Sequence, residues 1–152
     1  MLSIKTNRRA GFTLIEMLVA LMVTALVAAL AAPAYSAYVN RGRTAKAIAD
    51  VKAIEMSLER FMTANNRYPA TLAEAGITLV DPWGQTYYYL NMDGAKVGQV
   101  RKDKSLHPLN TDYDLYSAGA DGKTAKPLTA SISQDDVIRA RNGSFVGLAK
   151  DF

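Results

Sequence analysis

The chain has 152 residues, of which 18 are lysine or arginine and 14 are aspartate or glutamate, and it has no cysteine. This length suits one domain plus an anchoring segment, and the lack of cysteine excludes a disulfide framework, a thiolate metal site and a cysteine nucleophile. The net charge of +4 does not indicate nucleic-acid binding, because Lys5, Arg8 and Arg9 precede residue 12, and the 15 basic and 14 acidic residues after them nearly cancel.

A long apolar segment follows this basic leader. Residues 12–34 number 23, and a helix needs roughly 20 residues to cross a bilayer core. Glu16 is the one charged residue of the segment, and a carboxylate at the edge of hydrocarbon is unfavourable unless a cation neutralises it. A cut after Gly11 would create such a cation, because the new α-amino group of Phe12 would be free to pair with Glu16.

The leader, the motif Gly11-Phe12-Thr13-Leu14-Ile15-Glu16 and the apolar segment together resemble the type IV prepilins and the pseudopilins of type II secretion. The resemblance implies that a prepilin peptidase removes residues 1–11 and methylates Phe12. It also implies that residues 12–34 are the transmembrane and assembly half of one helix with a cytoplasmic N-terminus. Glu16 would then support assembly into a helical filament.

An ordinary secretory signal peptide is the main alternative, since Ala32-Pro33-Ala34 resembles a small-residue cleavage site. Two features oppose it. The apolar segment is longer than the about 7–15 residues of a usual signal peptide, and Glu16 stands at its start. N-terminal sequencing distinguishes the two, because signal peptidase would leave Tyr35 as the first residue and prepilin peptidase would leave a methylated Phe12.

Helix-forming residues continue through residues 35–65, which predicts one helix made of a membrane-spanning half and an amphipathic half. Apolar residues at a spacing near 3.6 mark one buried stripe on the second half: Ile48, Val51, Ile54, Leu58, Phe61 and Met62. Pro33 lies inside the helix and removes one backbone hydrogen bond, so we expect a kink or a locally opened turn there.

Residues 66–152 are predicted to be the globular part. Arg67-Tyr68-Pro69 ends the long helix, and residues 70–76 suit a short helix that ends at Gly76. Three short segments have the composition of strands and are bounded by turn residues: 86–90, 97–100 and 113–117. The predicted fold is therefore α+β, with the amphipathic half of the long helix packed on a small antiparallel sheet.

Four motifs of this part resemble the major pseudopilins of type II secretion: Arg67-Tyr68-Pro69, Asp81-Pro82-Trp83-Gly84, the tyrosine-rich segment 86–90 and the segment 114–122. The resemblance implies a pilin-like fold and a calcium ion in the loop after the Ala-Asp-Gly turn, and calcium accepts six to eight oxygen ligands in loose geometry. It assigns the ligands to the side chain of Asp121, to those of one or both of Asp135 and Asp136, and to the backbone carbonyl of Ala118, with Asn142 as a weaker candidate. The loop between Asp121 and Asp135 departs from the family, because it is longer and carries Lys123 and Lys126.

A helix start is the alternative for the paired aspartates. Ser133 and Asp136 have the spacing of a capping box, and residues 137–141 followed by Asn142-Gly143 would then be a short helix. In this interpretation the two carboxylates complement the helix N-terminus and bind no metal.

No enzyme site is predicted, because His107 is the only histidine and lies in a polar loop, and Ser117 and Ser144 lack a nucleophile-elbow pattern. The sequence predicts a structural subunit of a periplasmic pseudopilus of a type II secretion system, anchored by one span in the inner membrane before assembly. The implied partners are further copies of the chain, prepilin peptidase, minor pseudopilins, the inner-membrane assembly platform and membrane lipid. Two alternatives stay open: a type IV pilin for adhesion, motility or DNA uptake, and a membrane-tethered periplasmic module that binds calcium or another ligand.

Overall fold

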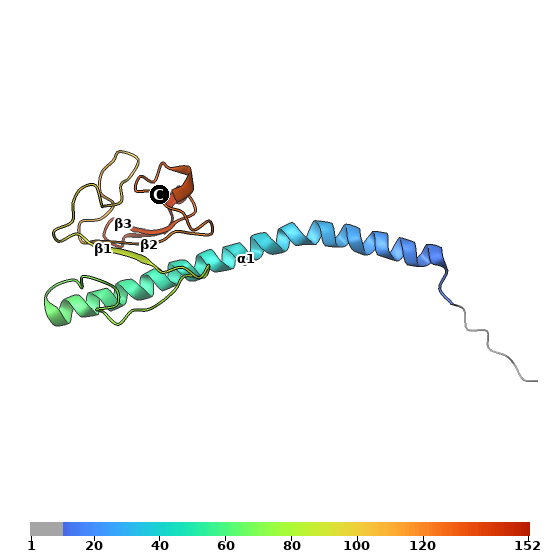
Figure 1. Ribbon diagram of the computed structural model, residues 1–152, viewed down its shortest axis with the longest axis horizontal. Helices are drawn as coiled ribbons and strands as arrows, with labels where there is room; N and C mark the ends of the chain where they lie inside the picture. The colour runs from blue at the N-terminus through green and yellow to red at the C-terminus, as the bar shows by residue number, and fades with distance from the viewer. Residues whose placement is uncertain (1–10) are drawn as a thin grey trace, which may run out of the picture. The chain divides into compact units, whose positions relative to one another are not determined.

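The computed structural model describes residues 11–152, so the basic residues of the predicted leader lie outside the described residues. One long helix, α1 (Leu14–Asn65), precedes four strands: β1 (Tyr88–Asn91), β2 (Tyr113–Ser117), β3 (Val137–Ala140) and β4 (Phe145–Leu148). Figure 1 labels the helix and β1, β2 and β3. Two short 3-10 helices, η1 (Ser131–Ser133) and η2 (Ala149–Asp151), precede β3 and follow β4. Contacts divide the chain into two units, one that ends at Val39 and one that comprises Asn40–Phe152.

The first unit is the apolar half of α1. Thr13 precedes the first helical residue, and the helix continues through Pro33 without interruption. The helix therefore shows no opened turn at Pro33, and the predicted kink there stays a prediction. The helix is long and apolar enough to cross a membrane.

In the second unit, residues 40–65 of α1 bury one stripe of side chains. Val51, Ile54 and Leu58 are buried as the helical spacing predicts, and Ala47 joins them one turn earlier. The other residues of the predicted stripe are partly buried: Ile48, Phe61 and Met62. The period of 3.6 therefore places the right face of the helix against the sheet.

The four strands form one antiparallel sheet in the order β1-β2-β3-β4, so each strand pairs with the next one along the chain. Because side chains alternate between the faces of a strand, the two faces carry different clusters. Tyr113, Leu115 and Val137 pack with the buried stripe of α1. Ile138 and Ala140 pack in a second cluster, with Leu109, Leu128 and Ala149. The arrangement confirms the predicted α+β fold.

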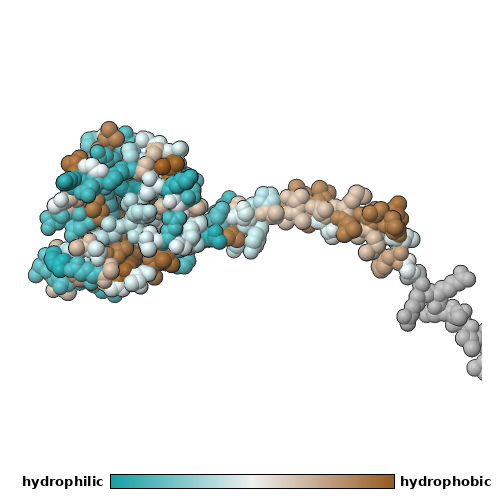
Figure 2. All heavy atoms as spheres, in the orientation of Figure 1, coloured by the Kyte–Doolittle hydropathy of each residue, from teal (hydrophilic) through white to brown (hydrophobic). Residues whose placement is uncertain are grey.

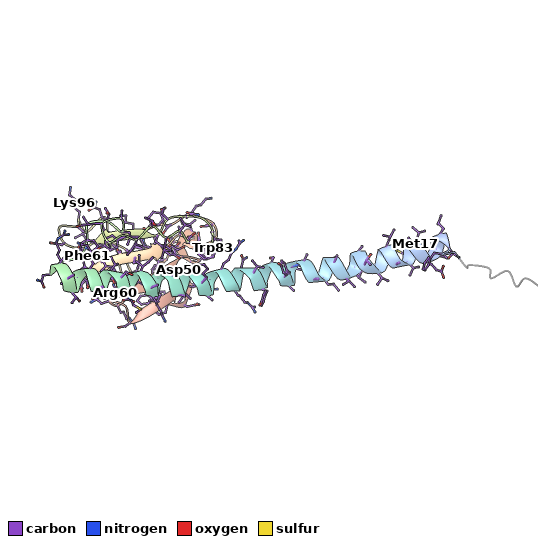
Figure 3. The ribbon with its side chains drawn as sticks, turned by 90° about the horizontal axis from the view of Figure 1, so that it is seen from below. Met17, Asp50, Arg60, Phe61, Trp83 and Lys96 are labelled. Atoms are coloured by element: carbon purple, nitrogen blue, oxygen red, sulfur yellow. The ribbon has the colours of Figure 1, made fainter. Side chains whose placement is uncertain are left out.

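The turn from Asp81 to Gly84 connects this core to β2. Oδ1 of Asp81 accepts hydrogen bonds from the backbone N–H groups of Trp83 and Gln85 at 3.0 and 2.8 Å. Its Oδ2 accepts a hydrogen bond from the hydroxyl of Ser117, in β2. Trp83 packs against the helix-covered core (Figure 3). Asp81 thus holds a turn and a strand together through one buried carboxylate.

Three sequence-based predictions of local structure are wrong. Residues 70–76 form turns instead of a helix, since Gly76, with a φ of 71°, reverses the chain and the N–H of Ile77 bonds to the carbonyl of Leu72. Residues 97–100 form a turn in place of a strand. Residues 137–140 are strand β3 and do not begin a helix, because they pair with β2 and β4.

Candidate functional site

The first candidate site is the apolar surface at the start of α1. Its large apolar side chains from Phe12 to Leu30 are between 48% and 86% exposed. They form the hydrophobic surface along this half of the helix in Figure 2. A helix that is apolar on all sides is stable only when lipid or other protein covers it. This surface must therefore be covered by membrane lipid, by another protein, or first by one and then by the other.

Thr13 and Glu16 form a capping box at the N-terminus of α1. Oε2 of Glu16 accepts hydrogen bonds from the backbone N–H of Thr13 at 2.8 Å and from its hydroxyl at 2.9 Å. In return, Oγ1 of Thr13 accepts a hydrogen bond from the N–H of Glu16 at 3.3 Å. These bonds satisfy helix N–H and hydroxyl donors at the end of the helix. The carboxylate of Glu16 is thus held by residues of its own chain.

The bond between Gly11 and Phe12 lies outside the helix. Residues 11–13 have no regular secondary structure, and the side chain of Phe12 is exposed. An exposed segment without regular structure is the kind of backbone that a peptidase reaches. Processing after Gly11 and methylation of Phe12 stay predictions, and the geometry is compatible with both.

The second candidate site is the loop of residues 118–136. Asp135 closes the turn at its start, because Oδ2 of Asp135 accepts hydrogen bonds from the N–H groups of Ala120 and Asp121 at 2.9 and 3.2 Å. Gly119 packs so tightly here that a Cβ atom would lie 2.4 Å from the carbonyl oxygen of Asp135. One carboxylate oxygen of Asp135 is therefore directed at backbone donors.

Asp136 lies in a different environment, because it is fully buried beside Arg101. Oδ2 of Asp136 accepts a hydrogen bond from the hydroxyl of Thr124 at 2.7 Å and lies 2.7 Å from Nη2 of Arg101. Burial raises the pKa of Asp136 to about 6, and the contacts with Thr124 and Arg101 oppose that rise. The carboxylate already has a cationic partner within the protein.

The side chains of Asp121 and Asn142 also have partners within the protein. Oδ1 of Asp121 accepts a hydrogen bond from the N–H of Lys123 at 2.8 Å. Asn142 lies elsewhere and exchanges hydrogen bonds with Thr111. In residues 11–152, no three His, Cys, Asp or Glu side chains are grouped as a metal site. Asp136 is already paired with Arg101 and so does not fit the predicted ligand set, whereas calcium binding by Asp121 and Asp135 stays a prediction.

The predicted capping box at Ser133 and Asp136 is also absent. The hydroxyl of Ser133 donates a hydrogen bond to the carbonyl of Ala125 at 2.9 Å and accepts one from its N–H at 2.8 Å. Ser133 thus connects two parts of the loop, at residues 125 and 133, and does not cap a helix.

Two residues that shape these sites were not predicted from the sequence. Thr13 has a local signal, since a threonine three residues before a glutamate at the start of an apolar run is a capping-box pattern. Arg101 has no such signal, because its partner Asp136 is far away in the sequence. Only the folded loops bring that pair together.

The chain is similar to known families in two adjoining segments. Residues 6–32 match the family described as "Prokaryotic N-terminal methylation motif". Residues 33–104 match the family described as "Type IV minor pilin ComP, DNA uptake sequence receptor".

Relatives that align with more than three quarters of the chain share one name. The "Type II secretion system core protein G" of Pseudomonas aeruginosa is 29% identical over 141 residues, which cover 77% of this chain and 87% of that protein. Proteins with the same name from Escherichia coli K12 and Vibrio cholerae are 29% and 26% identical, and each alignment covers 78% of this chain and 86% of the relative. No solved structure matches at a comparable level of significance.

Proposed function

The chain carries the N-terminal methylation motif of type IV prepilins and is homologous to core protein G of type II secretion systems, and on this basis we propose that it is a structural subunit of a pseudopilus. The apolar half of α1 anchors the subunit in the inner membrane. The same half of the helix then becomes the assembly surface of the filament.

One observation carries this proposal: the apolar side chains of residues 12–30 are exposed on the single subunit. Lipid covers this surface while the helix spans the membrane. When the subunit leaves the membrane, the surface needs a new apolar environment, and helices of neighbouring subunits provide one. Polymerisation therefore buries the surface that membrane insertion buried before.

Glu16 provides the one charged side chain of this assembly surface, and we expect it to form an ion pair between neighbouring subunits. Cleavage after Gly11 creates an α-amino group on Phe12, and a Glu16 carboxylate of a neighbouring subunit would neutralise it. Such a pair is favourable in a low-dielectric interior, whereas either charge alone there is strongly unfavourable. Within the single subunit, the capping box with Thr13 satisfies the same carboxylate. The proposal is that Glu16 exchanges its own Thr13 for the amine of a neighbour.

The proposed orientation places the leader in the cytoplasm and residues 40–152 in the periplasm. The hypothesised partners are further copies of the chain, prepilin peptidase, minor pseudopilins and the assembly platform of the inner membrane. Tyr35 and Tyr38, at the end of the apolar half, are 71% and 76% exposed. Tyrosines of this kind gather at membrane–water interfaces, which supports an anchored helix that ends near these residues.

Processing is the first test of the proposal. The chain is produced in cells with and without prepilin peptidase, and the N-terminal peptide is identified by mass spectrometry. We expect residues 1–11 to be removed and Phe12 to be methylated only when the peptidase is present. Gly11→Leu should retain the leader. Gly42→Leu is a matched control, because an added Cβ at Gly42 has no atom within 4 Å. A mature chain that starts at Tyr35 would contradict the proposal.

A type IV pilin for DNA uptake is the second candidate, and the match of residues 33–104 to a DNA uptake receptor family favours it. Deletion of the gene separates the two functions. A pseudopilus subunit predicts loss of secreted hydrolases with normal DNA uptake, whereas an uptake pilin predicts the reverse. The purified chain should also bind DNA, with an affinity that falls steeply with salt, only in the second case.

A further inference from the structure

We propose that the guanidinium group of Arg101 takes the place of a divalent cation in this chain, so that the loop of residues 118–136 is closed by an internal cation and is independent of calcium. The proposal follows from the misfit between the predicted calcium ligands and the observed contacts of Asp136. It does not depend on whether the filament serves secretion or DNA uptake.

Arg101 is placed to act as this cation. Its side chain is 3% exposed, that of Asp136 is fully buried, and Nη2 of Arg101 lies 2.7 Å from Oδ2 of Asp136. Nη1 of Arg101 donates a hydrogen bond to the hydroxyl of Thr124, which itself donates to Asp136. The guanidinium also lies over the ring of Tyr116, 4.2 Å from its centroid. One cation thus contacts the loop at residue 124, the residue before β3, and strand β2.

Backbone pairing brings Arg101 to the loop. The N–H of Lys102 bonds to the carbonyl of Lys126 at 3.0 Å, and the N–H of Leu128 bonds to the carbonyl of Lys102 at 3.0 Å. The N–H of Arg101 donates at 2.6 Å to Oδ2 of Asp114, a buried carboxylate in β2. The backbone of residues 101–102 is therefore fixed on two sides, and the guanidinium is held where the loop closes.

A calcium ion at Asp136 would compete with this guanidinium. Both would bind the same buried carboxylate, and two positive charges within a few ångströms repel strongly in a low-dielectric interior. Oδ1 of Asp136 has no hydrogen-bond partner among the described residues. If calcium does bind at Asp136, Oδ1 is therefore the oxygen that is free to coordinate it. Nε and Nη2 of Arg101 also lack hydrogen bonds, so the pair is held by charge and proximity.

The wild-type chain gives the first test. The mature full-length protein in detergent is heated in roughly millimolar calcium and in excess chelator, and unfolding is followed by circular dichroism. Limited trypsin digestion at Lys123 and Lys126 reports on loop closure. We expect the same unfolding midpoint and the same cleavage rate in both conditions. Calcium at about 100 times its Kd would raise the midpoint by about 10 °C, so a rise of that size, or protection by calcium, would overturn the proposal.

Variants test the internal cation itself. Arg101→Met leaves Asp136 buried without a cation, and we expect a midpoint lowered by about 10 °C or more and faster cleavage after Lys123. Asp136→Asn should also lower the midpoint. The double variant should be clearly more stable than the sum of the two losses predicts, because it leaves neither charge unpaired. Lys104→Met, at an exposed cation of the same segment, is the control and should change neither measurement. Additive losses in the double variant would contradict the pairing.

Discussion

Arg139 of β3 donates a hydrogen bond from Nε to Glu55 of α1 at 2.8 Å and connects the sheet to the helix across 84 positions of sequence. The same guanidinium donates to both carboxylate oxygens of Asp112, at 2.8 and 2.7 Å. It also lies over the ring of Tyr113, 4.0 Å from the centroid. A planar guanidinium suits such a set of partners, because its donors are fixed in one plane. This network helps to set how residues 40–65 of the helix lie on the sheet.

Arg139→Met should therefore destabilise the second unit by about 3–5 kcal/mol, because it leaves Glu55 and Asp112 without the cation that both share. Arg139→Lys should recover only part of the loss, since an ammonium group cannot reproduce the two-pronged contact with Asp112. The measurement is urea unfolding of residues 40–152, a unit with its own core.

Arg60→Met is the control for this experiment, because Arg60 is an exposed residue of the same helix. We expect it to change the free energy of unfolding by less than about 0.5 kcal/mol. A loss below about 1 kcal/mol for Arg139→Met would mean that the network contributes little beyond surface ion pairs.

Gly119 allows a second prediction with a matched control. Gly119 and Gly76 both have positive φ, 67° and 71°, but only at Gly119 would an added Cβ meet backbone, 2.4 Å from the carbonyl oxygen of Asp135. Gly76→Ala should cost about 1–2 kcal/mol from the left-handed conformation alone. Gly119→Ala should cost at least about 3 kcal/mol, since the turn closed by Asp135 must also move. If both variants lose the same free energy of unfolding in urea, the turn at Gly119 must rearrange to fit the Cβ atom at little cost.

Much of the helix could be predicted from the sequence, because its signals are local. A repeat near 3.6 residues is visible within one segment, and it identified Val51, Ile54 and Leu58 as buried. Strand β2 could be predicted for the same reason, since residues 113–117 are rich in strand-forming residues and are bounded by turns. These elements need no distant partner to be recognised.

The hairpin of β3 and β4 could not be separated from a short helix in this way. Val137 to Arg141 is a short apolar run after a Ser-x-x-Asp pattern, and such a run suits either structure. Pairing with β2 decides it, together with positive φ at Arg141, Asn142 and Gly143, which turns the chain back into β4. An Asn-Gly pair between two apolar runs is a hairpin signal as well as a helix stop, so the pair alone does not separate the two structures.

The first candidate site was more predictable than the second for a related reason. The motif from Gly11 to Glu16 acts within six adjacent residues, so its chemistry can be inferred from the order of side chains. The contacts of Asp136 depend on how residues 101–102 pair with residues 126–128, and no local pattern reports that pairing. A resemblance to a family shows which positions correspond to the family's ligands. It does not show that Arg101 lies beside one of these positions, Asp136, in this chain.

Glu16 allows a prediction about assembly. Glu16→Gln keeps the shape and an oxygen that accepts hydrogen bonds from Thr13, but it removes the charge. We expect normal removal of the leader and a yield of sheared filaments lowered by about tenfold or more, because the amine of Phe12 would be buried without an anion. Met17→Leu, at the next residue of the apolar surface, should assemble normally. Immunoblots of cell and sheared fractions measure both steps, and normal filament yield for Glu16→Gln would rule out the charge pair.

Four buried or partly buried tyrosines predict how stability depends on alkaline pH. Burial, with a hydrogen bond from the Tyr68 hydroxyl to Glu59 at 2.9 Å, raises the pKa of Tyr68 to about 12. Burial also raises the pKa of Tyr87, Tyr89 and Tyr113. In the unfolded chain these phenols ionise near their ordinary pKa of about 10. The unfolded state therefore binds fewer protons than the folded state above that pH. The protonated tyrosines therefore contribute fully to the free energy of unfolding below about pH 10, and this contribution is lost as the pH rises toward about 12.

Urea unfolding of residues 40–152 between roughly pH 9 and pH 11 measures this loss as a falling free energy of unfolding. Tyr68→Phe removes one of the titrating groups, so its curve should fall less steeply with pH than that of the wild type, whatever its stability at neutral pH. Tyr88→Phe is the matched control, because Tyr88 is an exposed tyrosine of the same unit. Its curve should parallel the wild-type curve. If the Tyr68→Phe curve is also parallel, the phenol of Tyr68 ionises equally in the folded and unfolded chain.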